Sequence, residues 1–161
     1  MFTGIVQALG TVVTTTATPS GRRCEFALGA LAGRHFNPGD SIAVNGACLT
    51  VVTLAADRFG ADISAETLRV TTLGSLQPGS PVNLEPAMTL SDPLGGHLVT
   101  GHVDGIAEVA ELRREADTAI VRFELPEGLR RYAARKGSIC IDGVSLTVND
   151  IADDRVLVTL V

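Results

Sequence analysis

Short runs of β-favouring residues, separated by turn residues, make up most of the chain. Thr11–Thr18 is rich in Val and Thr, Pro19-Ser20-Gly21 predicts a turn, and Arg23–Leu28 predicts the returning strand. Ser41–Val44 and Pro81–Glu85 have the same character and are the next expected strands. The pattern therefore predicts antiparallel strands joined by tight turns.

Two dipeptides predict hairpins, and one segment predicts a helical turn. Asn45-Gly46 and Asp142-Gly143 each lie between two β-type runs, and both residues of such pairs tolerate the positive φ that a two-residue hairpin needs. Leu68–Leu73 is the expected helical turn, with Ser64 as a plausible cap before it and Gly74 as its end.

The chain contains an internal repeat with an offset of 97 residues. Without any gap, residues 3–64 align with residues 100–161, and 16 of the 62 pairs are identical. Several identities fall in runs, such as Leu49-Thr50-Val51 against Leu146-Thr147-Val148. The chain is therefore a duplication of one β unit.

The repeat and the strands together predict the architecture. Five or six short antiparallel strands in each copy leave two edges to hide, which favours closure into a barrel. We expect an all-β fold of two similar six-stranded Greek-key-type β-barrels in tandem, with short helical turns. The expected boundaries are 1–86 and 98–161 for the barrels and 87–97 for the connector.

The second copy is shorter than the first. Its last residue, Val161, corresponds to Ser64, so the counterparts of Ala65–Glu85 are missing and the second barrel is expected to be incomplete. We expect that the chain is truncated at its carboxyl end or continues in an unrecorded tail.

Composition and charge narrow the function classes. The net charge is −5 and the basic residues are scattered, so we expect no nucleic acid partner. No apolar run approaches the roughly 18 residues that span a bilayer, and the amino terminus lacks a secretory signal. Three cysteines without metal spacing, Cys24, Cys48 and Cys140, are typical of reduced thiols in a cytoplasmic protein. We therefore expect no membrane and no metal.

The two copies differ in chemistry beside their shared motifs. The paired positions that change are Ile5 against His102, Cys48 against Ser145, and Gly39 against Lys136. The two barrels are therefore expected to bind the same kind of ligand while presenting different functional groups to it.

Five motifs resemble those of a known family. MFTGIV, NGACLTV, AETL, GGHLVTGHVDG and KGSICIDGVSLTVN are similar, in order and spacing, to the riboflavin synthase alpha-chain family. The resemblance covers essentially the whole chain. It implies a dismutation in which two molecules of 6,7-dimethyl-8-ribityllumazine exchange a four-carbon unit, giving riboflavin and 5-amino-6-ribitylaminouracil without a metal or redox cofactor.

The resemblance also implies how the protein assembles. Each barrel would hold one lumazine, and the active site would form between the amino-terminal barrel of one subunit and the carboxy-terminal barrel of another. A carboxy-terminal helix joins the family's subunits as homotrimers, and neither that helix nor a carboxylate of the second pocket has a counterpart within these 161 residues. Lumazine synthase is a further possible partner.

Carried over onto this sequence, the resemblance implies two pockets. The first would comprise Gly4, Ile5, Val6, Cys48, Leu49, Thr50, Asp62, Ile63, Ser64, Ala65, Glu66 and Thr67, with Phe2 beside its ligand. The second would comprise Gly101, His102, Val103, Lys136, Ser145, Leu146, Thr147 and Val161.

Catalytic roles are expected at His102, Ser145, Thr147 and Cys48. His102 is the natural candidate for proton transfer, although a histidine can also merely bond a neighbour. Ser145 and Thr147 share one strand face and would hold a carbonyl, a water or a ribityl hydroxyl, against the plain alternative of solvent-facing hydroxyls. Cys48 would be a pocket wall or a polarising thiol rather than a covalent nucleophile, or simply a buried small side chain.

The remaining polar candidates have ordinary alternatives. Glu66 and Thr67 offer acceptors and backbone donors to a polyol chain, or simply cap a helix. Lys136 would contact the second ligand, but a lysine in a turn is more often solvated. His35 and His97 receive no role.

Three rival classes stay open. A non-catalytic lumazine or flavin antenna protein resembles the same family, and His102, Ser145 and Cys48 favour the enzyme over it. A flavin reductase-type barrel would need a nicotinamide partner domain, and a purely structural role fits the duplicated polar motifs least.

Overall fold

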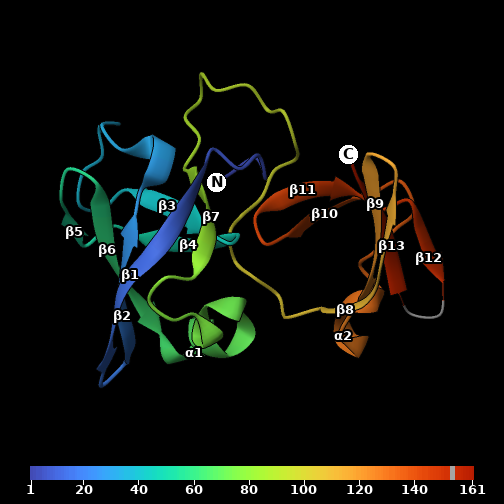
Figure 1. Cartoon of the computed structure of the whole chain (residues 1–161), viewed down its shortest axis with the longest axis horizontal. Coiled ribbons are helices and arrows are strands. Elements are labelled where there is room, and N and C mark those ends of the chain that lie inside the picture. The colour runs from blue at the N-terminus through green and yellow to red at the C-terminus, as the bar shows by residue number, and fades with distance from the viewer. Residues whose placement is uncertain (153–154) are drawn as a thin grey trace.

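Most of the regular structure in the computed structural model, which describes residues 1–152 and 155–161, is β-strand. The elements of the first copy are β1 (Ala8–Thr18), β2 (Gly21–Ala27), η1 (Gly29–Leu31), β3 (Ser41–Val44), β4 (Ala47–Thr50), β5 (Thr53–Leu54), β6 (Arg58–Ser64), α1 (Ala65–Val70), η2 (Thr72–Ser75) and β7 (Pro81–Pro86). Those of the second are β8 (Glu108–Glu115), β9 (Thr118–Glu124), α2 (Glu127–Arg130), β10 (Ser138–Ile141), β11 (Val144–Thr147), β12 (Asp150–Ala152) and β13 (Arg155–Leu160). The two sets lie side by side in Figure 1, and the predicted all-β class is confirmed.

The repeat in the sequence is also a repeat of structure. The bounds of β2, β3 and β4 become those of β9, β10 and β11 when 97 is added to each residue number. β1 and β8, β5 and β12, and β6 and β13 correspond in the same way, with small differences at their ends. The same local patterns therefore fold into the same elements twice.

The first copy is a single seven-stranded antiparallel sheet in the order β4-β3-β7-β1-β2-β6-β5. Its last strand, β7, pairs with both β1 and β3, so that Leu84 lies opposite Ala8 on one side and Val44 on the other. The two edge strands, β4 and β5, are consecutive in the chain and separated only by Val51 and Val52. The short link between β4 and β5 therefore brings the two edges of the sheet near each other at that point.

The second copy is divided into two sheets. β12-β13-β9-β8 forms one and β10-β11 forms the other. Residues up to 161 supply no strand that corresponds to β7, which in the first copy joins the equivalents of β8 and β10. All eight residues of β8 are exposed.

Alternation of side chains explains how the first sheet makes its core. In β6, Phe59, Ala61 and Ile63 are buried, whereas Asp62 and Ser64 are exposed. The ring of Phe59 stacks on that of Phe26 from β2, with 5.2 Å between centroids. Burying one phenylalanine side chain contributes about 2 kcal/mol, so this face of the sheet is the main source of stability.

Both predicted hairpins are confirmed. Asn45 and Gly46 have φ of 46° and 80°, and Asp142 and Gly143 have φ of 47° and 82°. Positive φ at both central residues is the geometry of a two-residue hairpin turn that matches the twist of its strands.

The predicted helical turn is shifted and split. α1 begins at Ala65 because the Ser64 hydroxyl accepts a hydrogen bond from the Thr67 N–H, at 3.1 Å, which confirms Ser64 as the cap. The helix ends at Val70, and the extended Thr71 starts the 3-10 turn η2, which contains Gly74. The expected range Leu68–Leu73 is therefore wrong at both ends.

Candidate ligand-binding site

The two copies meet around an approximate two-fold relation. Phe2 and Val99, which are 97 residues apart, form an antiparallel bridge in which each N–H donates to the other's carbonyl, at 2.8 and 3.0 Å. A methyl group built on Gly46 would lie 2.8 Å from the backbone nitrogen of Gly143, also 97 residues away. Contacts between equivalent residues are what a two-fold relation between the copies requires.

The segment that begins each copy crosses to the other copy. The Cys48 N–H donates to the carbonyl of Gly101 at 2.9 Å, and the Ser145 N–H donates to the carbonyl of Gly4 at 2.7 Å. These two hydrogen bonds are equivalent under the 97-residue offset. Each Thr-Gly motif therefore lies against the β4-type strand of the opposite copy.

Glycine is required at both crossings. Gly4 and Gly101 have φ of +74° and +79°, and a methyl group on either would come within 2.7 Å of the Cβ of Ser145 or Cys48, respectively. A side chain would therefore be strained by the backbone and would also overlap the facing strand.

This crossing corrects the expected grouping of the pocket residues. We expected Gly4, Ile5 and Val6 beside Cys48, and Gly101, His102 and Val103 beside Ser145. The structure reverses the pairing, because each opening segment packs on the other copy. The repeat alone does not distinguish a segment that stays with its copy from one that is exchanged.

The crossing produces a pocket of about 400 Å³ between α1, β4 and the segment after Gly101. The residues that line it are Ala47, Cys48, Glu66, Thr67, Arg69, Val70, Thr71, Gly101, His102, Val103 and Asp104. Six of them are expected site residues, drawn from both of the expected pockets. Thiol, imidazole, hydroxyl and carboxylate groups therefore surround one cavity, with main-chain atoms of Gly101 at its wall.

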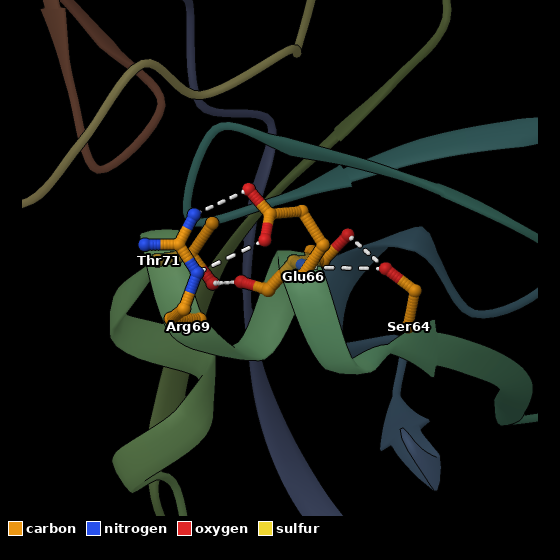
Figure 2. A network of polar contacts seen from close by, with 5 residues as sticks. Ser64, Glu66, Arg69 and Thr71 are labelled. Atoms are coloured by element: carbon orange, nitrogen blue, oxygen red, sulfur yellow. Dashed lines mark hydrogen bonds and ion pairs between the residues drawn. The ribbon is translucent and has the colours of Figure 1, made fainter. Parts of the chain in front are cut away.

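A polar network on α1 forms one wall of the pocket (Figure 2). The Arg69 guanidinium donates two hydrogen bonds to the Glu66 carboxylate, at 2.9 and 2.6 Å, and these lower the pKa of Glu66. Thr71 donates to the Thr67 carbonyl at 2.6 Å, and the Thr67 hydroxyl lies 2.9 Å from that of Ser64. Glu66 is therefore an ionised acceptor rather than a proton donor near neutral pH.

Some expected site residues lie in the core or on the outside of the sheet instead. Phe2, Leu49 and Ile63 are buried, and Phe2 is completely inaccessible. Asp62 is exposed and accepts two hydrogen bonds from Arg23, at 2.7 and 2.6 Å, which lower its pKa. Thr50 is exposed and is not among the residues lining the 400 Å³ pocket.

Fewer of the residues expected in the second site lie close together than of those expected in the first. Ser145 is half-buried against Gly4, and Leu146 packs on the small core of the second copy. Thr147, Lys136 and Val161 are exposed. In the first copy the wall of the pocket comes from α1, for which residues up to 161 supply no counterpart.

Three polar residues were missed by the sequence reasoning. Arg69 lies three residues after Glu66, a spacing that favours an ion pair on a helix. Glu85 is buried in β7 and accepts hydrogen bonds from the Thr3 N–H at 2.6 Å, the Thr3 hydroxyl at 2.7 Å and the Gly4 N–H at 3.0 Å. The third is His97, whose ring nitrogen Nδ1 lies 2.7 Å from the Ser145 hydroxyl.

Two other kinds of feature are absent from the described part of the chain. No cluster of three or more His, Cys, Asp or Glu side chains there is arranged to hold a metal ion. No helix among the residues that the structure describes is long and apolar enough to cross a bilayer.

Comparison with known protein families and solved structures identifies the class of protein. The chain matches the family described as "Lumazine binding domain" over residues 3–87 and again over 100–161. Its structure is similar to that of LumP complexed with riboflavin, with a TM-score of 0.90 and 30% identity over 99% of this chain and 86% of that one. LumP complexed with 6,7-dimethyl-8-(1'-D-ribityl) lumazine is similar as well, with a TM-score of 0.87 and 29% identity over 99% and 85%.

Curated relatives identify the particular family within this class. A riboflavin synthase of Mycobacterium tuberculosis is 45% identical over 156 residues, which cover 96% of this chain and 77% of the relative. One from Actinobacillus pleuropneumoniae is 41% identical over 165 residues, which cover 100% and 74%. The chain therefore belongs to the riboflavin synthase family of enzymes, in agreement with the motifs in its sequence.

Proposed function

We propose that this protein catalyses the dismutation of two molecules of 6,7-dimethyl-8-ribityllumazine. One molecule gives up a four-carbon unit and becomes 5-amino-6-(D-ribitylamino)uracil, and the other receives the unit and becomes riboflavin. The atoms of two substrates equal those of the two products, so the reaction consumes no oxidant or reductant, and the proposed reaction uses no metal. The family, the curated relatives and the LumP complexes with lumazine and riboflavin support this proposal.

The observation that carries the proposal is a pair of equivalent sites with different chemistry. A dismutation needs two copies of one substrate to play opposite parts, as donor and as acceptor. The approximate two-fold relation repeats one crossing twice, with Cys48 and His102 in one site and Ser145 and Ile5 at the same positions of the other. We therefore assign one lumazine to each copy, with 1–86 and 98–161 as the two binding units.

The groups of the first pocket suit the chemistry of a lumazine. An imidazole at His102 is suited to take a proton from the acidic 7-methyl group near neutral pH. Thr67 and the Glu66 carboxylate suit the hydroxyls of the ribityl chain, and Cys48 forms a wall or a polarising contact. Holding two rings at the correct distance supplies much of the rate, since effective molarities for well-placed pairs reach roughly 10⁵ M or more.

At the second site, Ser145 and Thr147 are the expected polar contacts to a ring carbonyl, a water or a ribityl hydroxyl. Both lie on β11, where residues two apart share a face. Lys136 remains a proposed contact of the second ligand from its turn.

The proposal is tested by incubating the protein with 6,7-dimethyl-8-ribityllumazine alone and separating the products. We expect riboflavin and the uracil in equal amounts, with two lumazines consumed for each riboflavin. Bound fluorescent lumazine that is never consumed would contradict the dismutation. That outcome would instead support the alternative, a non-catalytic antenna-type binder, which the structural similarity to LumP favours.

Assembly and location are further parts of the proposal. We propose that the protein works in the cytoplasm as a self-associated species, the homotrimer being the expected form, with lumazine synthase as a possible partner. Sedimentation velocity over a range of concentrations tests self-association, and a monomer at every concentration would contradict it.

A further inference from the structure

The second site does not receive an imidazole from the repeat. Ser145 corresponds to Cys48, but the segment that crosses to Ser145 contains Ile5 where the other crossing segment contains His102. If the repeat alone built the two sites, only the first would have a histidine.

The connector between the copies supplies a histidine to Ser145 instead. The His97 ring nitrogen Nδ1 lies 2.7 Å from the Ser145 Oγ, within the range of a strong hydrogen bond. His97 lies outside the paired residues 3–64 and 100–161, so the repeat assigns it no partner. His97 therefore makes the two sites differ in a way that the paired positions do not show.

The contact between His97 and Ser145 is held by main-chain contacts on both sides. The His97 N–H donates to the Thr3 carbonyl at 3.0 Å, and the Ser145 N–H donates to the Gly4 carbonyl at 2.7 Å. A methyl group on Gly96 would overlap the Thr3 carbonyl oxygen and lie 3.0 Å from the Ser145 Oγ, so only glycine lets the connector lie this close. Both side chains are half-buried, which favours a persistent hydrogen bond over one exchanged with water.

We propose that His97 is a positioning residue that fixes the Ser145 hydroxyl for the ligand of the second site, an inference that rests on the proposed function. A serine hydroxyl has one hydrogen and two lone pairs and rotates freely unless a partner restrains it. The ring at Nδ1 engages either the hydrogen or one lone pair of the hydroxyl, which restricts the rotation of the hydroxyl and leaves its other hydrogen-bonding sites for the ligand. The ligand of the second site then meets an oriented group, whereas the first site presents the Cys48 thiol and the His102 imidazole.

Four substitutions, alone or combined, test the positioning role through turnover. In H97N the side-chain amide lies near the former position of Nδ1, whereas in H97Q the amide has similar bulk but extends beyond that position. Both substitutions are conservative enough for the protein to fold. We expect H97Q to lower kcat roughly two- to tenfold, the range for losing one hydrogen bond, and H97N to stay within about twofold of the parent. In an S145A background, H97Q should cause no further loss, because its effect passes through the hydroxyl. H35Q, at an exposed histidine outside the site, is the matched control.

A binding measurement separates this inference from the proposed reaction. Fluorescence titration of the parent protein with 6,7-dimethyl-8-ribityllumazine should give two bound ligands per chain. H97Q should reduce the affinity for one of them, whereas H97N should preserve it. When Ser145 is already alanine, H97Q should not change the affinity further. A parent protein that binds two ligands but never forms riboflavin would refute the dismutation. The affinities of H97Q with and without S145A would still decide the role of His97 in that case. Equal losses in H97N and H97Q, a full H97Q effect in the S145A background, or one ligand per chain would each overturn the inference.

Discussion

The two copies have the same strands but not the same packing. In the first copy, β7 joins β1 to β3. The core of this copy includes Phe26, Phe59 and Leu84, each of which is 0% exposed. In the second, the four-stranded and two-stranded sheets share a small buried cluster of Val121, Leu125, Val148, Val156 and Val158. Local sequence therefore determines the same strands in both copies, and in the first copy β7 joins them around one core.

The same difference extends to the sites. Glu85, on the joining strand, holds the Thr3-Gly4 segment against Ser145 through three hydrogen bonds. The equivalent Thr100-Gly101 segment lies against Cys48 without a corresponding carboxylate from residues up to 161. The first copy thus supports the opening segment that contributes to the second copy's site.

Removing the chemical difference between positions 102 and 5 should cause the largest change. His102→Ile places at position 102 the residue found at its pair, Ile5. We expect kcat to fall by about 100-fold or more, because general acid–base catalysis by a side chain contributes on that scale. Lumazine affinity should change much less, since Cys48, Glu66 and Thr67 still line the pocket. Steady-state kinetics with His35→Ile as control measures this, and an unchanged kcat would remove His102 from proton transfer.

Truncating paired phenylalanines tests the difference in packing. Phe26 is completely buried, whereas Phe123, its pair in β9, is only partly buried. Phe26→Ala should lower the free energy of unfolding by about 3–5 kcal/mol, the usual cost of emptying a core site, and Phe123→Ala by less than half as much. Urea unfolding followed by circular dichroism measures both, and equal losses would mean that the two copies are packed equally well.

Removing the carboxyl group of Glu85 tests the link between the copies. Glu85→Ala leaves the N–H groups of Thr3 and Gly4 without their partner, and each unsatisfied buried group costs about 1–3 kcal/mol. We expect a loss of about 3 kcal/mol in unfolding free energy and weaker binding at the second site. Glu108→Ala, in the exposed strand β8, is the control and should change stability by less than about 0.5 kcal/mol. Similar losses in both variants would refute the role of Glu85.

The smallest effect should come from an ion pair that only the first copy has. Arg23 and Asp62 correspond to Ile120 and Thr159, which cannot form such a pair. Because the pair lowers the pKa of Asp62, its contribution is present above the ordinary aspartate pKa of 3.8 and is lost as pH falls through the lowered value. Asp62→Asn should slightly reduce stability at pH 7 and no longer do so in strong acid. Thermal unfolding at both pH values checks this, and a constant difference between parent and variant would contradict it.

Much of the local structure was predictable from the sequence. The hairpins at Asn45-Gly46 and Asp142-Gly143, the cap at Ser64 and the strand Pro81–Glu85 rest on short-range rules, and the structure confirms them. The helical turn was misplaced because Ser64 starts the helix immediately and Thr71 ends it. Residues close in sequence carried the information in each case.

The arrangement of the site was less predictable, because it depends on long-range pairing. Gly4 and Gly101 have the same neighbours in sequence whether they pack on their own copy or on the other. Glu85 and His97 act on Thr3 and Ser145, which are 82 and 48 residues away, and no spacing rule connects such positions. Identities between the copies pointed to segments that meet in the structure, but they did not show which segments are combined.

The measurement that tests the crossed site most directly is an NMR study of bound 6,7-dimethyl-8-ribityllumazine. Nuclear Overhauser effects from one ligand to assigned protons of Cys48 and Thr67 identify the first pocket. We predict that the same ligand also shows effects to His102 and Val103, which come from the second copy. A ligand that shows effects to Cys48 and Ile5 together, with His102 contacting a different ligand beside Ser145, would contradict the crossing and the account of the two sites.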